Sequence, residues 1–597
     1  MSEKMKRRVG ERLACAGVLA AAGAWLAGLS AVAVWLRLLV LAIAAVPLCA
    51  SARAALRCWL RTRALAPIVW AACFACAFVL GKQVLNTDAV TWRGLTVAAG
   101  QFCALFVLSA CAALALCGLR TASLMREAWA TPRPTRVFWC AWLVIFLCYV
   151  PYLLLRYPAA LSYDSMVQLE QVTGIAPLSN QHPLAHTLLI SAVYHALRLL
   201  GAPPRVALAG FTVLQMLGMS GVFAATVAFI ARRVRRAWPW CLALAWFALN
   251  PIHAFHSVTV WKNVPWSACV LALMLVLYRI AETRETAPVR VVPLFLLALA
   301  VCLLQNTGVP VVTFLALCAL GMLRRARRRV VGATLCAVLV SLVLTGPIAG
   351  ALDIAKPHTA EMMSVPIQQI GRAMQYPQDR LTPDQRARLE RYLPIDAWQQ
   401  SYHYAAADNI KFHPAFQNEA LDSDPAAFLA LWASLLPKYP AAYVMAYLTH
   451  SVAYWHPTAK GDTLLVMSVN YPWPGLEIFD TRSLLPGHQG LSVDINGLRE
   501  RSLELLSPFF SIGWMLWCAA LAAMLLLRAR QPRFLLVLMP LLGNWLAVML
   551  AAPTRGETRY LYAAFTALPV VVLLALGALR GEDAGEGDAG LMRKRSD

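Results

Sequence analysis

YPAALSYDSMVQLEQVTGIAPLSNQHPLAH, residues 157–186, is a polar stretch in a chain that is otherwise largely apolar. It holds Asp164 after a proline turn and, further on, a His-Pro pair that begins at His182. The SYDSMVQLEQ segment predicts a short helix, on which Asp164, Gln168 and Gln171 share one face because they follow at i, i+4 and i+7. A carboxylate on a short helix between membrane segments is placed to act as a base on a bound ligand. The alternative is a solvated loop acid.

The composition predicts an all-α integral membrane bundle. Of the 597 residues, 60% are hydrophobic and only 14% are charged, whereas soluble domains average about 25% charged residues. Many apolar runs reach the roughly 20 residues that a helix needs to cross a bilayer. The net charge of +23 does not indicate nucleic-acid binding, because the basic residues lie in short clusters between apolar runs, as they do in cytoplasmic loops.

The basic clusters predict about 14 spans with both termini in the cytoplasm. The predicted spans are 13–30, 33–51, 64–81, 94–117, 137–155, 206–230, 237–256, 260–280, 291–304, 308–323, 330–350, 508–527, 534–551 and 560–579. Run 183–200 is not counted as a span, since it would then place the cluster Arg232–Arg236 outside, against the positive-inside rule. We expect this run to lie along the external surface as an amphipathic helix.

This topology divides the chain into five regions. They are an N-terminal membrane region of four spans (1–135), a membrane core (136–350) with a first external loop (157–205), an external soluble domain of mixed secondary structure (351–505), three C-terminal spans (506–580) and a disordered cytoplasmic tail (581–597). All 16 cysteines lie in or beside apolar segments and none lies in 351–505. The external domain is therefore not a disulfide scaffold.

Polar residues from distant parts of the chain are predicted to reach the same external surface. Asp164, Lys262, Arg555, Glu557 and Arg559 all fall there. An acid among basic residues at the outer ends of helices suits a site that holds a phosphate and activates a hydroxyl group. The alternative is that Lys262 and Arg559, each beside an aromatic residue, only anchor the chain at an aromatic belt.

The histidines do not favour a metal site. His403, His413, His450 and His456 lack the tight ligand spacing of motifs such as HExxH. A divalent metal is therefore left open as a cofactor and no metal ligand is assigned.

The order of a basic loop, a span, YPAALSYDSMVQ, a His-Pro pair, a surface helix and a span ending in ARRVRR resembles the first external loop of the GT-C superfamily of membrane glycosyltransferases. That superfamily includes protein mannosyltransferases and lipid A aminoarabinose transferases. Other motifs resemble a bacterial branch of uncharacterised multi-span proteins grouped with GT-C. They are NPIHAFHSVTVWKNVPW (250–266), VPIQQIGRA (365–373), AAADNIKF (405–412), PKYPAAYVMAYLTHSVAYWHP (437–457) and PTRGETRYLY (553–562).

The resemblance covers about 137–580 and has two departures. The family often carries Lys-Asp where this chain has Lys262-Asn263. Many GT-C enzymes also have two adjacent acids in the first loop, whereas here Ser165 follows the acid and Glu170 is the nearest second one. These departures put metal dependence in doubt.

The resemblance implies transfer of a sugar from a polyprenyl-phosphate donor to an envelope acceptor, which is a glycan, a lipid or a protein, on the extracytoplasmic face of the cell membrane. Asp164 matches the acid of the family and is the expected base. The donor phosphate is expected at Lys262 and Arg559, with Arg555 behind them. The expected supporting residues are Gln168, Glu170, His182, Gln368, Gln369 and Arg372.

Two other classes of function stay open. A transporter or flippase of a lipid-linked glycan predicts charged residues inside the spans, and the sequence has few of them. A non-catalytic assembly factor predicts that Asp164 is dispensable. The aromatic residues of 351–505, such as Trp398 and Trp432, either stack on sugars or form the core of a small domain.

Overall fold

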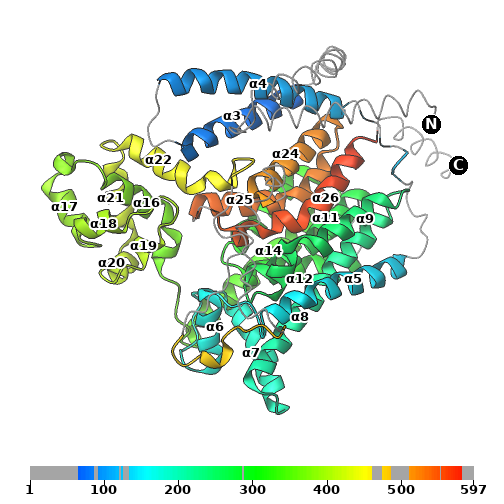
Figure 1. The fold of residues 1–597 in the computed structure, drawn as a ribbon, viewed down its shortest axis with the longest axis horizontal. Helices are drawn as coiled ribbons and strands as arrows, with labels where there is room; N and C mark the ends of the chain where they lie inside the picture. Colours follow the sequence, from blue (N-terminus) through cyan, green and yellow to red (C-terminus); the bar gives the residue numbers. More distant parts are fainter. Residues whose placement is uncertain are drawn as a thin grey trace.

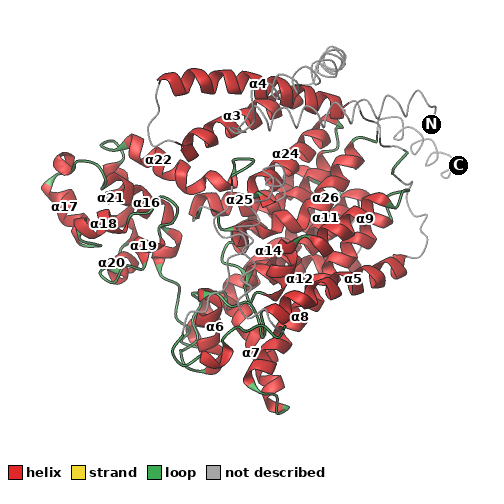
Figure 2. Cartoon of the chain, in the orientation of Figure 1, coloured by secondary structure: helices red, strands yellow, loops and turns green. Residues whose placement is uncertain are grey.

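The computed structural model describes residues 65–86, 92–117, 119, 121, 123–125, 134–284, 288–459, 473–485, 510–551, 553–554 and 556–580. Within these ranges the chain is helical, and its only β-pairing consists of isolated bridges. Figure 2 shows the helices in red, joined by green loops. The predicted all-α class is therefore confirmed. The first two predicted spans and the C-terminal tail lie outside the described residues.

Eight helices of the described part are long and apolar enough to cross a membrane, and a bent helix pair raises this number to nine. The eight are α3 (Ala66–Asn86), α4 (Trp92–Cys117), α5 (Pro134–Leu155), α8 (Pro204–Ala231), α11 (Asn263–Thr283), α14 (Arg327–Val343) with η1 (Leu344–Ile348) and α15 (Ala349–Ala351), η7 (Pro532–Leu538) with α25 (Met539–Ala551), and η8 (Thr558–Leu561) with α26 (Tyr562–Ala578). The chain is a multi-pass membrane protein.

The predicted number of about 14 spans is not confirmed. Three of the predicted spans are apolar helices of only 15 to 17 residues, namely α12 (Pro288–Leu304), α13 (Gly308–Met322) and α24 (Ile512–Arg528). The run 237–256 is broken into α9 (Trp238–Leu249) and α10 (Pro251–Val258), which meet at 49°. Asn250 caps α10 by accepting the N–H of Ile252, and Pro251 has no N–H with which to continue α9.

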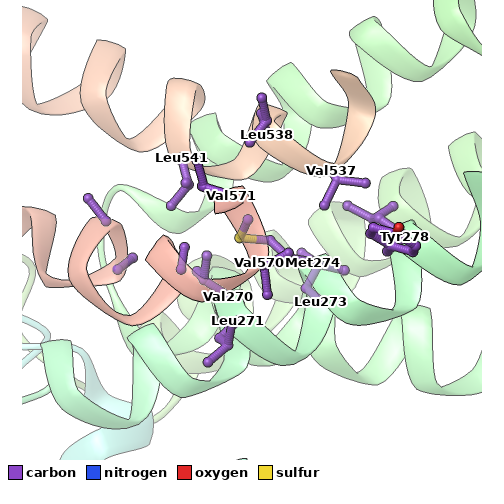
Figure 3. Close-up of a cluster of buried hydrophobic side chains, with 14 of the residues drawn as sticks. Val270, Leu271, Leu273, Met274, Tyr278, Val537, Leu538, Leu541, Val570 and Val571 are labelled. Atoms are coloured by element: carbon purple, nitrogen blue, oxygen red, sulfur yellow. The ribbon is translucent and has the colours of Figure 1, made fainter. Parts of the chain in front are cut away.

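The membrane helices lie side by side in one bundle (Figure 1). At its centre α11 packs against η7, α25 and α26, with side chains such as Met274, Leu541 and Val570 fully or nearly fully buried (Figure 3). Lipid tails are as apolar as these side chains, so the bundle is stabilised by close packing between helices more than by removal of apolar surface from water.

A unit of short helices stands at one end of this bundle (Figure 1). This helical unit contains α16 (Ser364–Ala373), α17 (Pro383–Glu390), α18 (Ile395–Ser401), α19 (Asp408–Lys411), α20 (Asn418–Ser423), α21 (Pro425–Leu435) and α22 (Pro440–Ser451). The mixed secondary structure predicted for 351–505 is wrong for the described residues of that region. Local caps explain the short helices, because Thr382 forms a capping box with Gln385 and Asp424 caps α21.

The aromatic residues of the helical unit form its core. Trp398 is fully buried in the same core as Tyr392 and Phe428, and its ring lies edge-on to Phe416. The Trp432 indole donates to Gln369 (2.7 Å). For Trp398 and Trp432 the structure thus favours the role of core residues over that of sugar-stacking platforms.

Residues 473–485 return to the first loop. Here α6 (Tyr163–Thr173) and α7 (Leu184–Leu199) pack together, and Leu476 and Phe479 join their core. The backbone N–H of Arg482 donates to the carbonyl of Tyr157 (2.8 Å). Figure 1 shows this segment in orange across α6, so a late part of the chain holds the loop that carries Asp164.

Candidate functional site

The position of Asp164 is set by the cap of α6. Ser162 and Ser165 form a capping box, with Ser162 N–H donating to Ser165 Oγ at 3.0 Å. The Ser165 hydroxyl also donates to the carbonyl of Val260 (2.8 Å), and the Trp261 indole donates to Ser162 Oγ. The residue found in place of a second acid, Ser165, is therefore used to fix the helix start. Asp164 lies in the first turn of a helix that is bonded to the chain just before Lys262.

Four distant segments meet at one oxygen of Asp164. Its Oδ2 accepts from Arg559 Nη1 at 2.8 Å and from Lys262 Nζ at 3.3 Å, and His182 Nδ1 lies 4.0 Å away. The other oxygen, Oδ1, has no hydrogen-bond partner among the described residues, and 17% of the side chain is exposed. The carboxylate is held through Oδ2, whereas Oδ1 has hydrogen-bonding capacity that the described residues do not use.

The two cations determine the charge of Asp164. Burial raises its pKa, but Arg559 and Lys262 outweigh burial and hold the pKa well below its ordinary value. The carboxylate is therefore ionised at physiological pH. It is a weak base for as long as both cations remain on it, because basicity falls with pKa.

His182 is a neutral neighbour of Lys262. The two nitrogens, Lys262 Nζ and His182 Nδ1, are 2.9 Å apart, so the ammonium donates and Nδ1 accepts, which leaves the imidazole proton on Nε2. Burial and the nearby Lys262 lower the pKa of His182 to about 4. Burial also lowers the pKa of Lys262, against the opposing effect of Asp164. Lys262 is thus a desolvated cation with a fixed direction.

Arg559 is held between two acids and two aromatic rings. Its Nε lies 2.9 Å from Glu557 Oε2, and its guanidinium carbon lies 5.3 Å from the Trp261 ring centre and 5.1 Å from that of Tyr560. Burial raises the pKa of Glu557, and Arg559 works against that rise. Sequence analysis placed Glu557 on this surface without a role; its spacing of two residues from Arg559 was the available signal.

The supporting residues of the first loop hold α6 in place. Gln168 donates to Thr187 Oγ1 at 2.9 Å and pairs with His186 Nδ1 at 3.0 Å, which joins α6 to α7. Glu170 accepts from the indole of Trp473 (2.8 Å), which joins α6 to the segment 473–485. Neither side chain is bonded to the Asp164 cluster.

The remaining predicted site residues lie elsewhere or cannot be placed. Gln368 donates to the carbonyl of His403, Gln369 to that of Tyr443 (3.1 Å), and Arg372 to the hydroxyl of Tyr402 (3.3 Å). These bonds lie inside the helical unit, so the structure does not bring the three residues to Asp164. Arg555 falls outside the described residues.

The helical unit is nevertheless tied to the site. Lys411 is buried and pairs with Glu361 (3.0 Å) and Asp408 (2.9 Å). Glu361 also accepts from the side chain of Gln181 (3.1 Å), the residue before His182. The unit is therefore joined by hydrogen bonds to the loop that lines the cluster.

The donor set fits an anion better than a metal. The part of the chain that the structure describes has no group of three or more His, Cys, Asp or Glu residues that could hold a metal ion. Among the described residues, the cations paired with Asp164 are Lys262 and Arg559, which repel a divalent cation. Two desolvated cations beside an open carboxylate oxygen suit a phosphate and a hydroxyl group.

The low pKa of His182 predicts an acid-sensitive stability. Its folded pKa of about 4 lies below the unfolded value of about 6.5, so between these values the unfolded chain binds more protons and stability falls as pH falls. When the pH is lowered from 7.5 to 5, we expect the free energy of unfolding of wild type to fall by about 2 kcal/mol more than that of His182→Gln. Denaturant titrations of both proteins in detergent at the two pH values measure this difference. A difference that does not change with pH would contradict the buried, neutral imidazole.

The comparisons with known proteins identify a family but no function. Residues 173–588 match a family of unknown function (DUF6020). No curated protein and no solved structure matched the chain.

Proposed function

The chain belongs to this DUF6020 family, and we propose that it is a membrane glycosyltransferase that moves a sugar from a polyprenyl-phosphate donor to an envelope acceptor on the extracytoplasmic face. The observation that carries the proposal is the contact of Asp164 Oδ2 with Arg559 and Lys262, at 2.8 and 3.3 Å, while Oδ1 has no hydrogen-bond partner among the described residues. A phosphate-binding pair thus adjoins a carboxylate that can receive a proton. The resemblance of the first loop to GT-C enzymes supports the reaction class.

Donor binding exchanges one anion for another. The phosphate of the donor takes the place of Asp164 Oδ2 as the partner of Lys262 and Arg559. Little reorganisation is needed, since His182 already directs Lys262 and Glu557 already directs Arg559. The polyprenyl chain lies between the membrane helices, and the helical unit is held next to the site because Lys411 pairs with Glu361, which accepts from Gln181.

Donor binding also activates the base. When the cations turn to the phosphate, Asp164 loses the charges that depress its pKa, and its basicity rises. Oδ1 then takes the proton of the acceptor hydroxyl as that oxygen bonds to the anomeric carbon. The bond from this carbon to the phosphate oxygen breaks, and polyprenyl phosphate leaves with its negative charge stabilised by Lys262 and Arg559.

Binding of the product lipid tests the proposal without knowledge of the sugar. We expect polyprenyl phosphate to raise the melting temperature of the purified chain in detergent, and Lys262→Gln to weaken its binding by about 10- to 100-fold, as expected for loss of a charged hydrogen bond. The control is Lys356→Gln, because Lys356 is an exposed lysine outside the cluster.

The same measurement separates the proposal from its rivals. Equal binding by wild type and Lys262→Gln, or no binding by either, would contradict the proposed site. An assembly factor that uses the cluster only as a structural tie predicts no binding. Transfer of radiolabelled sugar from a polyprenyl-phosphate donor by the reconstituted wild type distinguishes an enzyme from a transporter of the same lipid.

A further inference from the structure

A basic cavity lies at the N-terminal end of α5, whereas the Asp164 cluster follows its C-terminal end. A cavity of about 330 Å³ opens there between α5, α8 and α11. Its lining includes Phe138, Trp139, Phe229, Arg232 and Arg279, together with Thr135 and two alanines of α8. One wall is therefore aromatic and aliphatic, and the rim carries two guanidinium groups.

Within the described ranges, the two arginines of this cavity form no ion pair with a carboxylate, although the charge of nearby Glu282 acts on Arg279. Arg233, next to Arg232, is paired with Glu282 at 2.5 Å and stacks on the Phe229 ring at 3.6 Å. The guanidinium carbon of Arg279 also lies 5.7 Å from the centre of the Phe229 ring. Arg232 and Arg279 lie near Arg233, and the neighbouring acid Glu282 is already paired with Arg233. This excess of positive charge favours an anion in the cavity.

The surroundings indicate that this anion is part of a lipid. α5 has little of its apolar surface covered by protein, and the Trp139 side chain is 55% exposed. The cavity thus opens towards the bilayer beside an aromatic residue of the kind found at membrane interfaces. α5 has 22 residues and spans about 33 Å, which matches the hydrocarbon thickness of a bilayer. The cavity is therefore at the membrane boundary opposite to Asp164, which the positive-inside rule makes the cytoplasmic one.

We propose that this cavity binds the phosphate headgroup of an anionic phospholipid from the cytoplasmic leaflet, with the start of an acyl chain on the aromatic wall. Arg232 and Arg279 contact the phosphate, and Phe138 and Trp139 contact the apolar part. A free phosphate ion would engage only the arginines. This site does not depend on the proposed glycosyl transfer, since it lies on the other side of the membrane.

Lipid retention by the full chain tests the proposal. In detergent, native mass spectrometry with phosphatidylglycerol and phosphatidylcholine is expected to show a preference of about tenfold for the anionic lipid, equivalent to about 1.4 kcal/mol. The double substitution Arg232→Gln and Arg279→Gln is expected to remove this preference. The matched control is Arg235→Gln with Arg236→Gln, which removes two exposed charges of the same loop that do not line the cavity.

Two further measurements identify the ligand that the cavity binds. Ala225→Phe fills it without changing charge and is expected to lower phosphatidylglycerol retention as much as the arginine substitutions do. Inorganic phosphate at millimolar concentration is expected not to displace the lipid. Displacement by phosphate would overturn the lipid assignment in favour of a free ion, and an equal loss of retention in the Arg235 and Arg236 control would overturn the cavity as the site.

Discussion

Asp164→Asn is expected to lower sugar transfer by about 100-fold or more and at the same time to tighten the binding of polyprenyl phosphate. The amide cannot take the proton of the acceptor hydroxyl. It also carries no charge, so it no longer competes with the phosphate for Lys262 and Arg559, which now both contact Oδ2. Transfer is measured in proteoliposomes with a radiolabelled donor, and binding is measured by thermal shift in detergent.

Sugar transfer and lipid binding are expected to change in opposite directions, which distinguishes loss of the base from misfolding. A misfolded protein loses both transfer and binding. The control is Asp353→Asn, because Asp353 is exposed and has a φ of 53°, a conformation that asparagine tolerates. Unchanged transfer would remove Asp164 from the mechanism. Weaker lipid binding by Asp164→Asn would show that the carboxylate organises the two cations and does not compete for them.

Arg559→Gln is expected to lower the free energy of unfolding by about 3–5 kcal/mol, the usual cost of breaking a buried ion pair. Only 14% of the Arg559 side chain is exposed, and its loss leaves Asp164 and Glu557 as neighbouring buried acids. Denaturant titration in detergent, followed by tryptophan fluorescence, measures the change. Arg482→Gln is the control, since Arg482 is exposed and contacts Tyr157 through its backbone N–H.

A double-mutant cycle assigns this cost to the ion pair. With Asp164→Asn already present, Arg559→Gln is expected to cost clearly less than it does in wild type, because one of the two acids is then neutral. Equal costs in both backgrounds would contradict direct coupling. A cost below about 1 kcal/mol in wild type would indicate a solvated pair of the kind found on protein surfaces.

The meeting of Asp164, Lys262 and Arg559 could be predicted from the sequence, although not in detail. The lengths of the apolar runs and the sides of the basic clusters placed all three residues on one surface, and the structure brings them within 3.3 Å of a common oxygen. The sequence does not show that both cations bind Oδ2 of Asp164 or that His182 directs Lys262. These details depend on side-chain packing, which hydrophobic periodicity does not encode.

The number of spans, the break in one span and the position of three predicted site residues could not be predicted from the sequence. Hydropathy does not separate a full span from a shorter apolar helix such as α13, so it does not determine the number of spans. The break at Asn250-Pro251 had a local signal, since a residue before proline often ends a helix. Gln368, Gln369 and Arg372 were predicted near the site because they follow a span. The end of a span does not determine the path of the next segment, and in the structure all three lie in the helical unit.

The wide spacing of the cluster along the chain has a consequence for biosynthesis. Asp164 and Arg559 are 395 positions apart, so the ribosome completes the first loop and most of the membrane helices long before it makes the guanidinium. Until η8 emerges, Lys262 is the one cation among the described residues that is paired with the carboxylate, and Glu557 is also missing. A nascent or truncated chain therefore lacks the Arg559–Asp164 ion pair, and the cluster is complete only when η8 and α26 join the bundle.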